Sequence, residues 1–304
     1  MTRVRFIDDP AEFLAVAGDR LAADAALSMV VSRVTSRARD DAEAGVPPPA
    51  GAPRWWAVLL DGEEVVGAAM RTAPFAPFPP YLLPMPDDAA VALARELHTR
   101  GEHVGAVNGA LPAVRVFAEQ TARLTGGTAD VALHMRLFEL GELLAPAGVE
   151  GELRAVRPEE LDLVLEWLER FMADADEMAG RPRGASPHEA PSREDLGRRA
   201  RAGEYWFWVF GGRPVSLTVG SRPAFGVSGI GPVYTPPEER GHGYASAAVA
   251  AVSRRLLDQG ARVCLFTDQA NPTSNRIYQR LGFRAVADTA NLVIRPAPGA
   301  SGRP

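Results

Sequence analysis

The strongest constraint in this sequence is a pair of glycines between an apolar segment and an amphipathic one. Gly241 and Gly243 lie in the run Arg240-Gly-His-Gly-Tyr-Ala-Ser246, which follows an expected strand at residues 228–234. Beyond the run, apolar residues recur at the spacing of a buried helix face, namely Ala245, Ala248, Val249, Val252 and Leu256. The chain must therefore pass from a strand into a helix through backbone that no Cβ atom obstructs.

A junction of this kind is suited to binding an anion. The first amides of a helix have no partner within it, and they lie at the positive end of the helix dipole. The glycines let a ligand approach these amides, and Arg240 adds a full positive charge. We therefore expect a pyrophosphate here. The alternative is that the glycines only shape the start of the helix.

A dinucleotide-binding loop is a further alternative, because Gly241-x-Gly243-x-x-Ser246 nearly matches its fingerprint and Asp268 ends the next expected strand. In such a loop the glycines follow their strand directly. Here the five residues 236–240 lie between Thr235 and the first glycine, and two of them are glutamates. Both features argue against a dinucleotide.

The rest of the chain alternates between helical and strand periods. Helices are expected at residues 13–21, 25–39, 88–100, 113–124, 158–172, 193–201, 244–257 and 274–281. Strands are expected at residues 55–60, 65–70, 103–107, 131–140, 205–210, 215–220, 228–234, 262–267, 285–287 and 292–295. A loop rich in glycine, proline and serine is expected at residues 179–191.

The pattern restarts near the middle of the chain. Asp61-Gly62 and Gly211-Gly212 each join two expected strands, of which the first carries tryptophans. Pro112 and Pro272 each precede a helix, but at a larger offset, so the second half carries an insertion that includes the glycine loop. A tandem duplication explains this order, and chance sharing of short turns is the alternative. The expected division is a first domain at 1–141, a linker at 142–151, a second domain at 152–296 and a flexible tail at 297–304.

Composition excludes several classes of protein. The net charge of −5, without a lysine or arginine run, argues against nucleic-acid binding. No apolar run approaches the length of a membrane span, and the first residues lack a signal-peptide core. The single cysteine, Cys264, fits a reducing cytoplasm, where we expect the protein. The five histidines never cluster with it at metal-ligand spacing, so no metal is expected.

A second motif follows the glycine loop. Asn271-x-x-Ser274-x-x-Ile277-Tyr278-x-x-x-Gly282-Phe283 comes directly after an expected strand. Together with Arg240-x-x-Gly243-x-Ala245, it resembles the paired motifs of the GNAT superfamily of acyl-CoA-dependent N-acetyltransferases. The resemblance covers residues 152–296 and extends only weakly into the first half. It implies an α/β (α+β) fold of two tandem GNAT-like domains, each a mixed, mostly antiparallel twisted sheet flanked by helices.

The resemblance also implies which residues bind acetyl-CoA as co-substrate. In the family, two parallel strands separate to admit the pantetheine arm, the strand before the loop bonds that arm, and the loop amides hold the pyrophosphate. The implied set here is Val233, Tyr234, Thr235, Arg240, Gly241, His242, Gly243, Tyr244, Ala245, Ser246, Asn271 and Tyr278. Of these, the His242 side chain is expected to be solvated. No metal takes part.

Tyr278 is the expected catalytic residue, as the general acid that protonates the leaving coenzyme A thiolate. Packing on a short helix is its alternative role. The family often places a glutamate base on the strand before the loop, but residues 228–234 contain no carboxylate. A water chain, or an acid such as Glu204 or Asp268, stays open as the base. Cys264 is expected to be a small core residue.

The acceptor is expected to be a small-molecule amine that meets the segment 174–192. That segment mixes acids, Asp174 and Asp176 among them, with arginines, and the acids are suited to a cationic amine or are simply solvated. The sequence does not identify the acceptor. An oligomer is possible but not indicated.

The first half lacks the chemical groups of the second. The counterpart of the glycine loop, at residues 84–92, has no glycine or arginine, and Asp87-Asp88 would repel a pyrophosphate. Phe117 lies where Tyr278 lies in the second half. We therefore expect the first half to bind no coenzyme A and to buttress the second.

The sequence leaves three functions open. The first is an N-acetyltransferase that moves an acetyl group to a primary amine by direct attack in a ternary complex. The second is a non-catalytic acyl-CoA-binding regulatory protein, which the missing base keeps open. A nucleotide-dependent oxidoreductase is the weakest, and it predicts NAD(P) binding.

Overall fold

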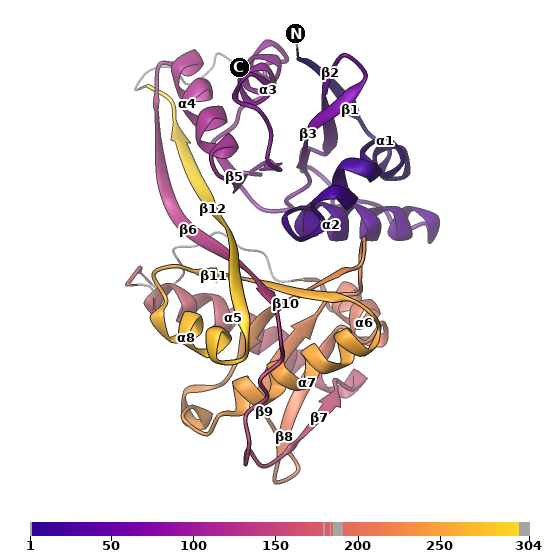
Figure 1. The fold of residues 1–304 in the computed structure, drawn as a ribbon, viewed down its shortest axis with the longest axis vertical. Helices are drawn as coiled ribbons and strands as arrows, with labels where there is room; N and C mark the ends of the chain where they lie inside the picture. The colour runs from indigo at the N-terminus through magenta and orange to yellow at the C-terminus, as the bar shows by residue number, and fades with distance from the viewer. Residues whose placement is uncertain (1, 179, 183, 185–190, 298–304) are drawn as a thin grey trace. The chain divides into compact units, whose positions relative to one another are not determined.

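The computed structural model describes residues 2–178, 180–182, 184 and 191–297, and the chain forms two compact units (Figure 1). The first unit joins residues 1–135 to residues 287–304, and the second holds residues 136–286. Strands β6 (Thr128–Leu140) and β12 (Phe283–Arg295) therefore each begin in one unit and end in the other. The expected domains were consecutive, whereas these packing units are not; the domain division itself stays a prediction. Most of the expected 179–191 loop lies outside the described residues.

The first unit is a sheet with helices on both faces. Its helices are α1 (Pro10–Ala23), α2 (Ala25–Glu43), α3 (Asp87–Thr99) and α4 (Ala113–Thr125). Its strands, apart from the shared β6 and β12, are β1 (Arg3–Ile7), β2 (Trp55–Asp61), β3 (Glu64–Arg71), β4 (Tyr81–Leu82) and β5 (Ala106–Ala110). The neighbours run in the order β1-β2-β3-β4-β5-β12.

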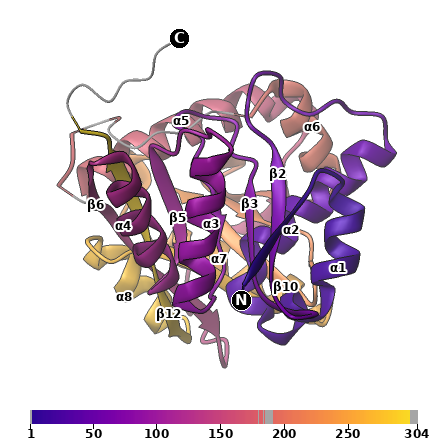
Figure 2. The ribbon, with the colours of Figure 1, turned by 90° about the horizontal axis from the view of Figure 1, so that it is seen from above.

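Side chains along β2 point alternately to the two faces of the sheet, which explains why a layer of helices covers each face, as Figure 2 shows from above. Trp55, Ala57 and Leu59 pack into one cluster, which also holds buried residues of α3 and α4. The residues between them, Trp56, Val58 and Leu60, pack into a second cluster with α1 and α2. Both faces of the strand are thus covered, so it reads as one continuous apolar run.

The second unit repeats this plan. Its helices are α5 (Leu161–Met178), α6 (Arg193–Arg201), α7 (Tyr244–Asp258) and α8 (Pro272–Arg280), with short 3-10 turns η1 (Pro158–Glu160) and η2 (Pro237–Glu239). Its own strands are β7 (Glu152–Ala155), β8 (Tyr205–Phe210), β9 (Arg213–Gly220), β10 (Val227–Tyr234) and β11 (Arg262–Asp268). The neighbours run in the order β6-β11-β10-β9-β8-β7.

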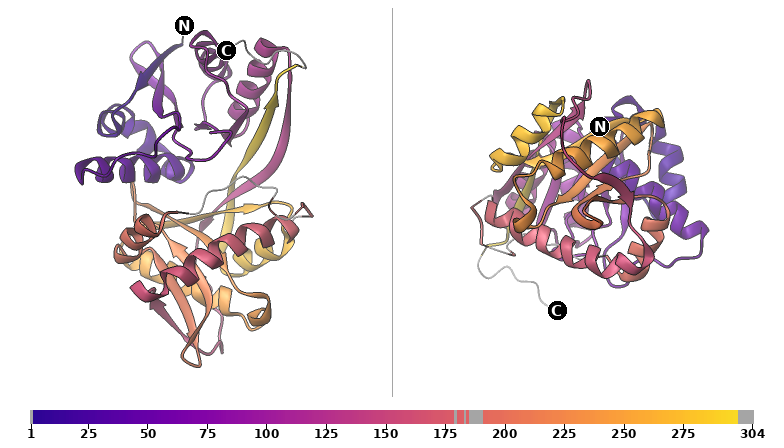
Figure 3. Two further views of the ribbon diagram at one scale, coloured as in Figure 1. Left: turned by 180° about the vertical axis from the view of Figure 1, so that it is seen from behind. Right: turned by 90° about the horizontal axis from the view of Figure 1, so that it is seen from below.

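Strand β8 alternates as β2 does. Tyr205 and Phe207 pack into a cluster with α5, which crosses this face of the sheet in the left view of Figure 3. Trp208 packs against Tyr244 and Ala248 of α7 on the opposite face. The fold class expected from sequence, two α/β units with mostly antiparallel sheets flanked by helices, is therefore confirmed.

Several strands differ from expectation. The sequence did not predict β1, β4 or β7; β4 has only two residues, and β1 and β7 are short end strands with exposed charged residues. The two expected strands at 285–287 and 292–295 are one strand, because residues 289–293 pair with β5 despite their polar members. The strand expected at 103–107 instead spans Ala106–Ala110.

The segment expected as a linker, 142–151, packs on the second unit. The Leu144 amide donates to the Leu281 carbonyl at 3.0 Å, and the Trp208 indole donates to the Glu150 carbonyl at 3.0 Å. Val149 lies against the glycine loop, because a Cβ built on Gly243 would be 3.1 Å from its Cγ2.

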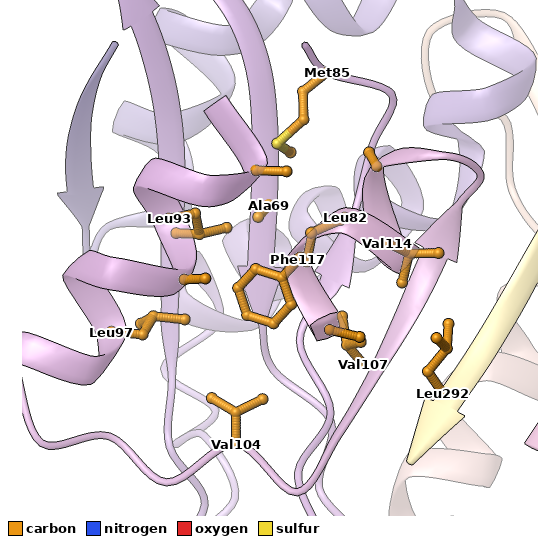
Figure 4. Packing of buried hydrophobic residues seen from close by; sticks show 14 of the residues in the cluster. Ala69, Leu82, Met85, Leu93, Leu97, Val104, Val107, Val114, Phe117 and Leu292 are labelled. Atoms are coloured by element: carbon orange, nitrogen blue, oxygen red, sulfur yellow. The ribbon is translucent and has the colours of Figure 1, made fainter. Parts of the chain in front are cut away.

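The centre of the first unit is closed and apolar. Its parallel pair, β4 and β5, is joined at Leu82 and Gly109, and a Cβ on Gly109 would lie 2.2 Å from the Leu82 carbonyl oxygen. Phe117 is fully buried within the apolar cluster that holds Leu82, Val107 and Leu292 (Figure 4). The ring therefore occupies core volume.

We expect Phe117→Tyr to destabilise the protein by about 1–3 kcal/mol, because its hydroxyl would be buried without a partner. Urea unfolding followed by tryptophan fluorescence measures this. Phe225→Tyr is the matched control, since Phe225 is 38% exposed, and we expect its effect to stay within about 0.5 kcal/mol. Equal stability of the Phe117→Tyr variant and the unaltered protein would contradict the closed core.

Candidate functional site

The central feature of the second unit is that β10 and β11 stop pairing before either strand ends. Their parallel register runs from Val227–Arg262 to Ile230–Leu265, yet β10 continues to Tyr234 and β11 to Asp268. On its other edge β10 stays paired with β9 up to Tyr234, after an irregularity beyond Ile230. Residues 231–234 therefore have a strand neighbour on one edge only, and their other edge faces the gap toward β11.

The glycine loop follows at once. Gly241 and Gly243 have φ values of 86° and 81°, in the left-handed region that glycine tolerates. Gly243 is the N-cap of α7, with no side chain capping the helix. In the described part of the chain, the amides of residues 241–246 have no hydrogen-bond acceptor. A helix start whose amides have no acceptor is suited to the anion that the sequence predicts.

Two contacts fasten the loop to the side of the sheet that carries α7. Glu239 is buried and forms an ion pair with Arg213 at the start of β9. The His242 ring stacks on Tyr244 with centroids 5.3 Å apart, and its Nδ1 lies 3.2 Å from the Glu239 carbonyl oxygen. His242 remains exposed, as expected.

Arg240 points away from the loop amides. Its Nε donates to the Thr235 carbonyl oxygen at 3.0 Å, and its Nη2 donates to Asp174 Oδ2 on α5 at 2.7 Å. The guanidinium expected beside a pyrophosphate therefore bridges the end of β10 and helix α5.

The β11–α8 turn is organised by two asparagines. Asn271 caps α8 by accepting from the Ser274 amide at 3.1 Å, and it is only 8% exposed. Asn275 was not predicted, yet its Nδ2 donates to the Asn271 carbonyl at 2.9 Å and its Oδ1 accepts from Thr267. An Asn one turn after an N-cap is the signal that would have identified it. A bond from Asn271 to pantetheine stays a prediction.

Tyr278 lies on α8 and packs edge-on against Phe283, with centroids 5.9 Å apart. It borders the apolar cluster that holds Ile230 and Leu265, the last paired residues of β10 and β11, and Val233 borders the same cluster. Burial raises the pKa of the phenol to about 12. The structure thus brings the expected acid to the face of the sheet where the strands separate.

The carboxylates considered as a base or as acceptor ligands already have basic partners. Glu204 is 2.9 Å from Arg199, and Asp268 is 2.6 Å from Arg181. Asp176 also contacts Arg181, and Asp174 contacts Arg240. Arg240 balances the charge of Asp174, whereas Arg181 is shared between Asp176 and Asp268, so the expectation that these acids hold a cationic amine is only partly weakened.

The remaining nucleophile and metal candidates do not extend the site. Burial is the main cause that raises the pKa of Cys264 to about 12, and the nearby Glu139 adds to it. The thiol is therefore protonated, and it is buried in β11. Among the described residues, no three His, Cys, Asp or Glu side chains gather as a metal site. None of the described helices has the length and apolarity needed to cross a bilayer.

Ser216 of β9 is a contributor that sequence reasoning missed. Its buried hydroxyl donates to the Tyr234 carbonyl at 3.1 Å and accepts from the Thr235 hydroxyl at 2.9 Å. It therefore holds the last residues of β10 from the neighbouring strand. No local pattern marks it, because a serine in an apolar strand becomes informative only once the register is known.

Comparison with known proteins agrees with this geometry. Residues 219–292 match the family model of the FR47-like proteins, and none of the curated proteins matches the chain. A tandem GNAT protein from the clavulanic acid biosynthesis pathway is 16% identical, covers 97% of this chain and 99% of its own, and has a TM-score of 0.57. A GCN5-related N-acetyltransferase from Sphaerobacter thermophilus is 17% identical, covers 97% and 95%, and has a TM-score of 0.56. A GNAT acetyltransferase from Colwellia psychrerythraea is 11% identical, covers 96% and 99%, and has a TM-score of 0.56.

At these identities the solved structures establish the fold, which is the tandem GNAT fold over nearly the whole chain. The FR47-like match runs from the end of β9 into β12, so it includes the separating strands β10 and β11 and the glycine loop between them. The resemblance to the GNAT superfamily is therefore confirmed at the level of the fold.

We expect Gly243→Ala to weaken coenzyme A binding by about tenfold or more. A left-handed φ costs an alanine about 1–2 kcal/mol, and the new Cβ would press on Val149 and displace the loop amides. Isothermal titration calorimetry with coenzyme A measures the affinity. Gly260→Ala is the matched control, because its φ of +77° imposes the same strain beyond the far end of α7, with nothing within 4 Å. Equal affinities of the two variants would contradict the assignment of the loop.

Proposed function

We propose that this tandem GNAT fold is an N-acetyltransferase, which moves the acetyl group of acetyl-CoA to a primary amine of a small-molecule acceptor. The observation that carries the proposal is the early end of the β10–β11 pairing beside the glycine loop. A backbone edge without a strand partner and a helix start without a cap stand next to each other in sequence and in the fold. An extended ligand with an anionic group is suited to both.

In this proposal, the edge of residues 233–235 bonds the pantetheine arm, and the amides of residues 241–246 bind the pyrophosphate. Val233 supports this, because it borders the cluster that also meets Tyr278. The thioester would then lie between the end of β10 and the phenol. A backbone amide of β10 is suited to polarise the thioester carbonyl, as in an oxyanion hole.

The reaction follows from these positions. The neutral amine attacks the carbonyl carbon and forms the C–N bond, and the carbonyl oxygen becomes an oxyanion. Loss of a proton from nitrogen to water and collapse of the oxyanion break the C–S bond. The departing sulfur takes its proton from Tyr278, which is reprotonated from solvent, and the products are an amide and coenzyme A thiol.

The raised pKa of Tyr278 shapes this last step. The phenol with a pKa of about 12 stays protonated at neutral pH. This pKa is higher than that of an alkyl thiol, so complete proton transfer from the phenol to a free thiolate is unfavourable in the ligand-free site. The phenol therefore first donates a hydrogen bond to the sulfur, and the proton moves as the C–S bond breaks.

A thermal-shift titration tests the co-substrate. Acetyl-CoA at about 100 times its Kd should stabilise the protein by roughly 2.7 kcal/mol and raise Tm by several degrees. NAD and ATP are the control ligands. A larger shift with NAD, or none with acetyl-CoA, would overturn the proposed function.

Tyr278→Phe should lower kcat by about 10²-fold on any accepted amine and leave the Kd for acetyl-CoA nearly unchanged. With a folded pKa of about 12, the proton is present at neutral pH and is lost only as the pH rises toward 12. Loss of the phenol proton should therefore cause no fall in the kcat of the unaltered protein from about pH 8 to pH 10. Stopped assays of thiol release measure both. A fall of kcat centred near pH 10, or full activity of the variant, would contradict this role.

A non-catalytic acyl-CoA-binding protein is the second candidate. The observation that favours it is that β10 carries no carboxylate and that Glu204 and Asp268 both contact arginines. Tight acetyl-CoA binding without turnover on a broad amine panel would support it over the enzyme.

A further inference from the structure

We infer that Arg240 and Asp174 form a positioning pair, which sets the glycine loop against helix α5. This inference rests on the proposed function, and it assigns Arg240 a task other than direct contact with the pyrophosphate. The motif places Arg240 at the start of the loop, where a cation is expected to meet the anion. Its side chain instead turns back to Thr235 and Asp174.

The first step of the argument is geometric. A guanidinium donates along several fixed directions, so one Arg240 bridges two acceptors, the Thr235 carbonyl oxygen at 3.0 Å and Asp174 Oδ2 at 2.7 Å. A lysine carries the same charge on a single nitrogen and cannot reproduce this fork. The bridge therefore depends on the shape of arginine as well as on its charge.

The second step is that both acceptors are themselves held. The Thr235 hydroxyl donates to Ser216, whose own hydroxyl donates to the Tyr234 carbonyl. Asp174 has a side chain only 12% exposed, on the helix that packs across β10. The bonds thus form one connected path from β9 through the end of β10 and Arg240 to α5.

The third step is that a matching contact fastens α5 on the other side of the opening. Arg181, just beyond α5, is 2.6 Å from Asp268 at the end of β11, and it also contacts Asp176. The carboxyl-terminal end of α5 is therefore bonded to the ends of both β10 and β11, beyond the point where these two strands stop pairing. Arg240–Asp174 is the tie on the β10 side, and the loop amides begin at the next residue.

The pair should therefore act on affinity through the loop. With the pair intact, residues 235–240 hold the following amides in one arrangement. Without it, those amides must be ordered by the ligand, which costs binding free energy. The chemistry at the thioester does not involve the pair, so the effect falls on the KM for acetyl-CoA.

Three variants separate a positioning pair from a direct anion ligand: Asp174→Asn, Arg240→Gln and Arg240→Lys. For a positioning pair, each should raise the KM and the calorimetric Kd for acetyl-CoA about tenfold with kcat within about twofold. The double variant Asp174→Asn with Arg240→Gln should be no worse than either single one, because one bridge is lost in all of them. Glu160→Gln is the matched control, since it breaks the Arg154–Glu160 pair, at 2.6 Å, away from the loop.

The contrary results are equally specific. If Arg240 contacts the pyrophosphate directly, Arg240→Lys should retain affinity, and Asp174→Asn should leave it unchanged or increase it by freeing the cation. Either outcome would contradict the positioning role of Arg240 and Asp174. Hydrogen exchange of the ligand-free protein keeps this test apart from the proposed function. The amides of Glu239, Arg240 and Ala247 donate to carbonyls within the segment 235–246, so they should exchange faster in Asp174→Asn than in Glu160→Gln even if no acetyl-CoA binds. Equal exchange would also contradict the positioning role of the pair.

Discussion

The site proposed in the second unit depends on one interruption in a hydrogen-bond ladder. Strand β10 is held by β9 along one edge as far as Tyr234, but β11 accompanies it only to Ile230. Residues 231–233 of this edge are half-exposed and Tyr234 is buried, so the backbone groups that β11 leaves without a partner need water or a ligand. In the proposed function, acetyl-CoA completes this edge beside the uncapped helix start. The bonds from Ser216 explain how the edge stays open, because they hold the end of β10 from the side of β9.

The first unit has the same arrangement of strands and helices, but there the corresponding parallel strands, β4 and β5, stay paired. Its parallel pair is joined at Leu82 and Gly109, where even a methyl group would meet the Leu82 carbonyl oxygen. The helix that follows β4 begins with Asp87 and Asp88, and Phe117 fills the core. The first unit thus has packing residues and paired strands at the points where the second unit has the residues proposed to bind a ligand. This contrast supports an ancestral duplication in which only the second half retained the opening.

Much of this could be predicted from sequence, and what could not has a physical reason. Alternation in the tryptophan strands and the helical period after Gly243 depend on neighbours a few residues apart, so β2, β8 and α7 were predicted almost to the residue. Strand β12 was divided in two, because its middle is polar and only its pairing with β5 makes it a strand. The glycine loop and Tyr278 could be identified as local motifs. The role of Ser216 and the partner of Arg240 depend on residues far along the chain, which no spacing reveals.

The ion pairs around α5 also constrain how an acceptor could be recognised. Asp174 and Asp176 read in sequence as free acids that could attract a cationic amine, but each contacts an arginine brought by the fold. The Arg240–Asp174 pair exerts little net field at a distance, since its two charges largely cancel, but Arg181 is shared by Asp176 and Asp268 and cannot balance both. In the proposed function, an amine that binds near the end of α5 would therefore meet carboxylates that are partly balanced, and its selection would depend on shape and hydrogen bonds as well as on charge.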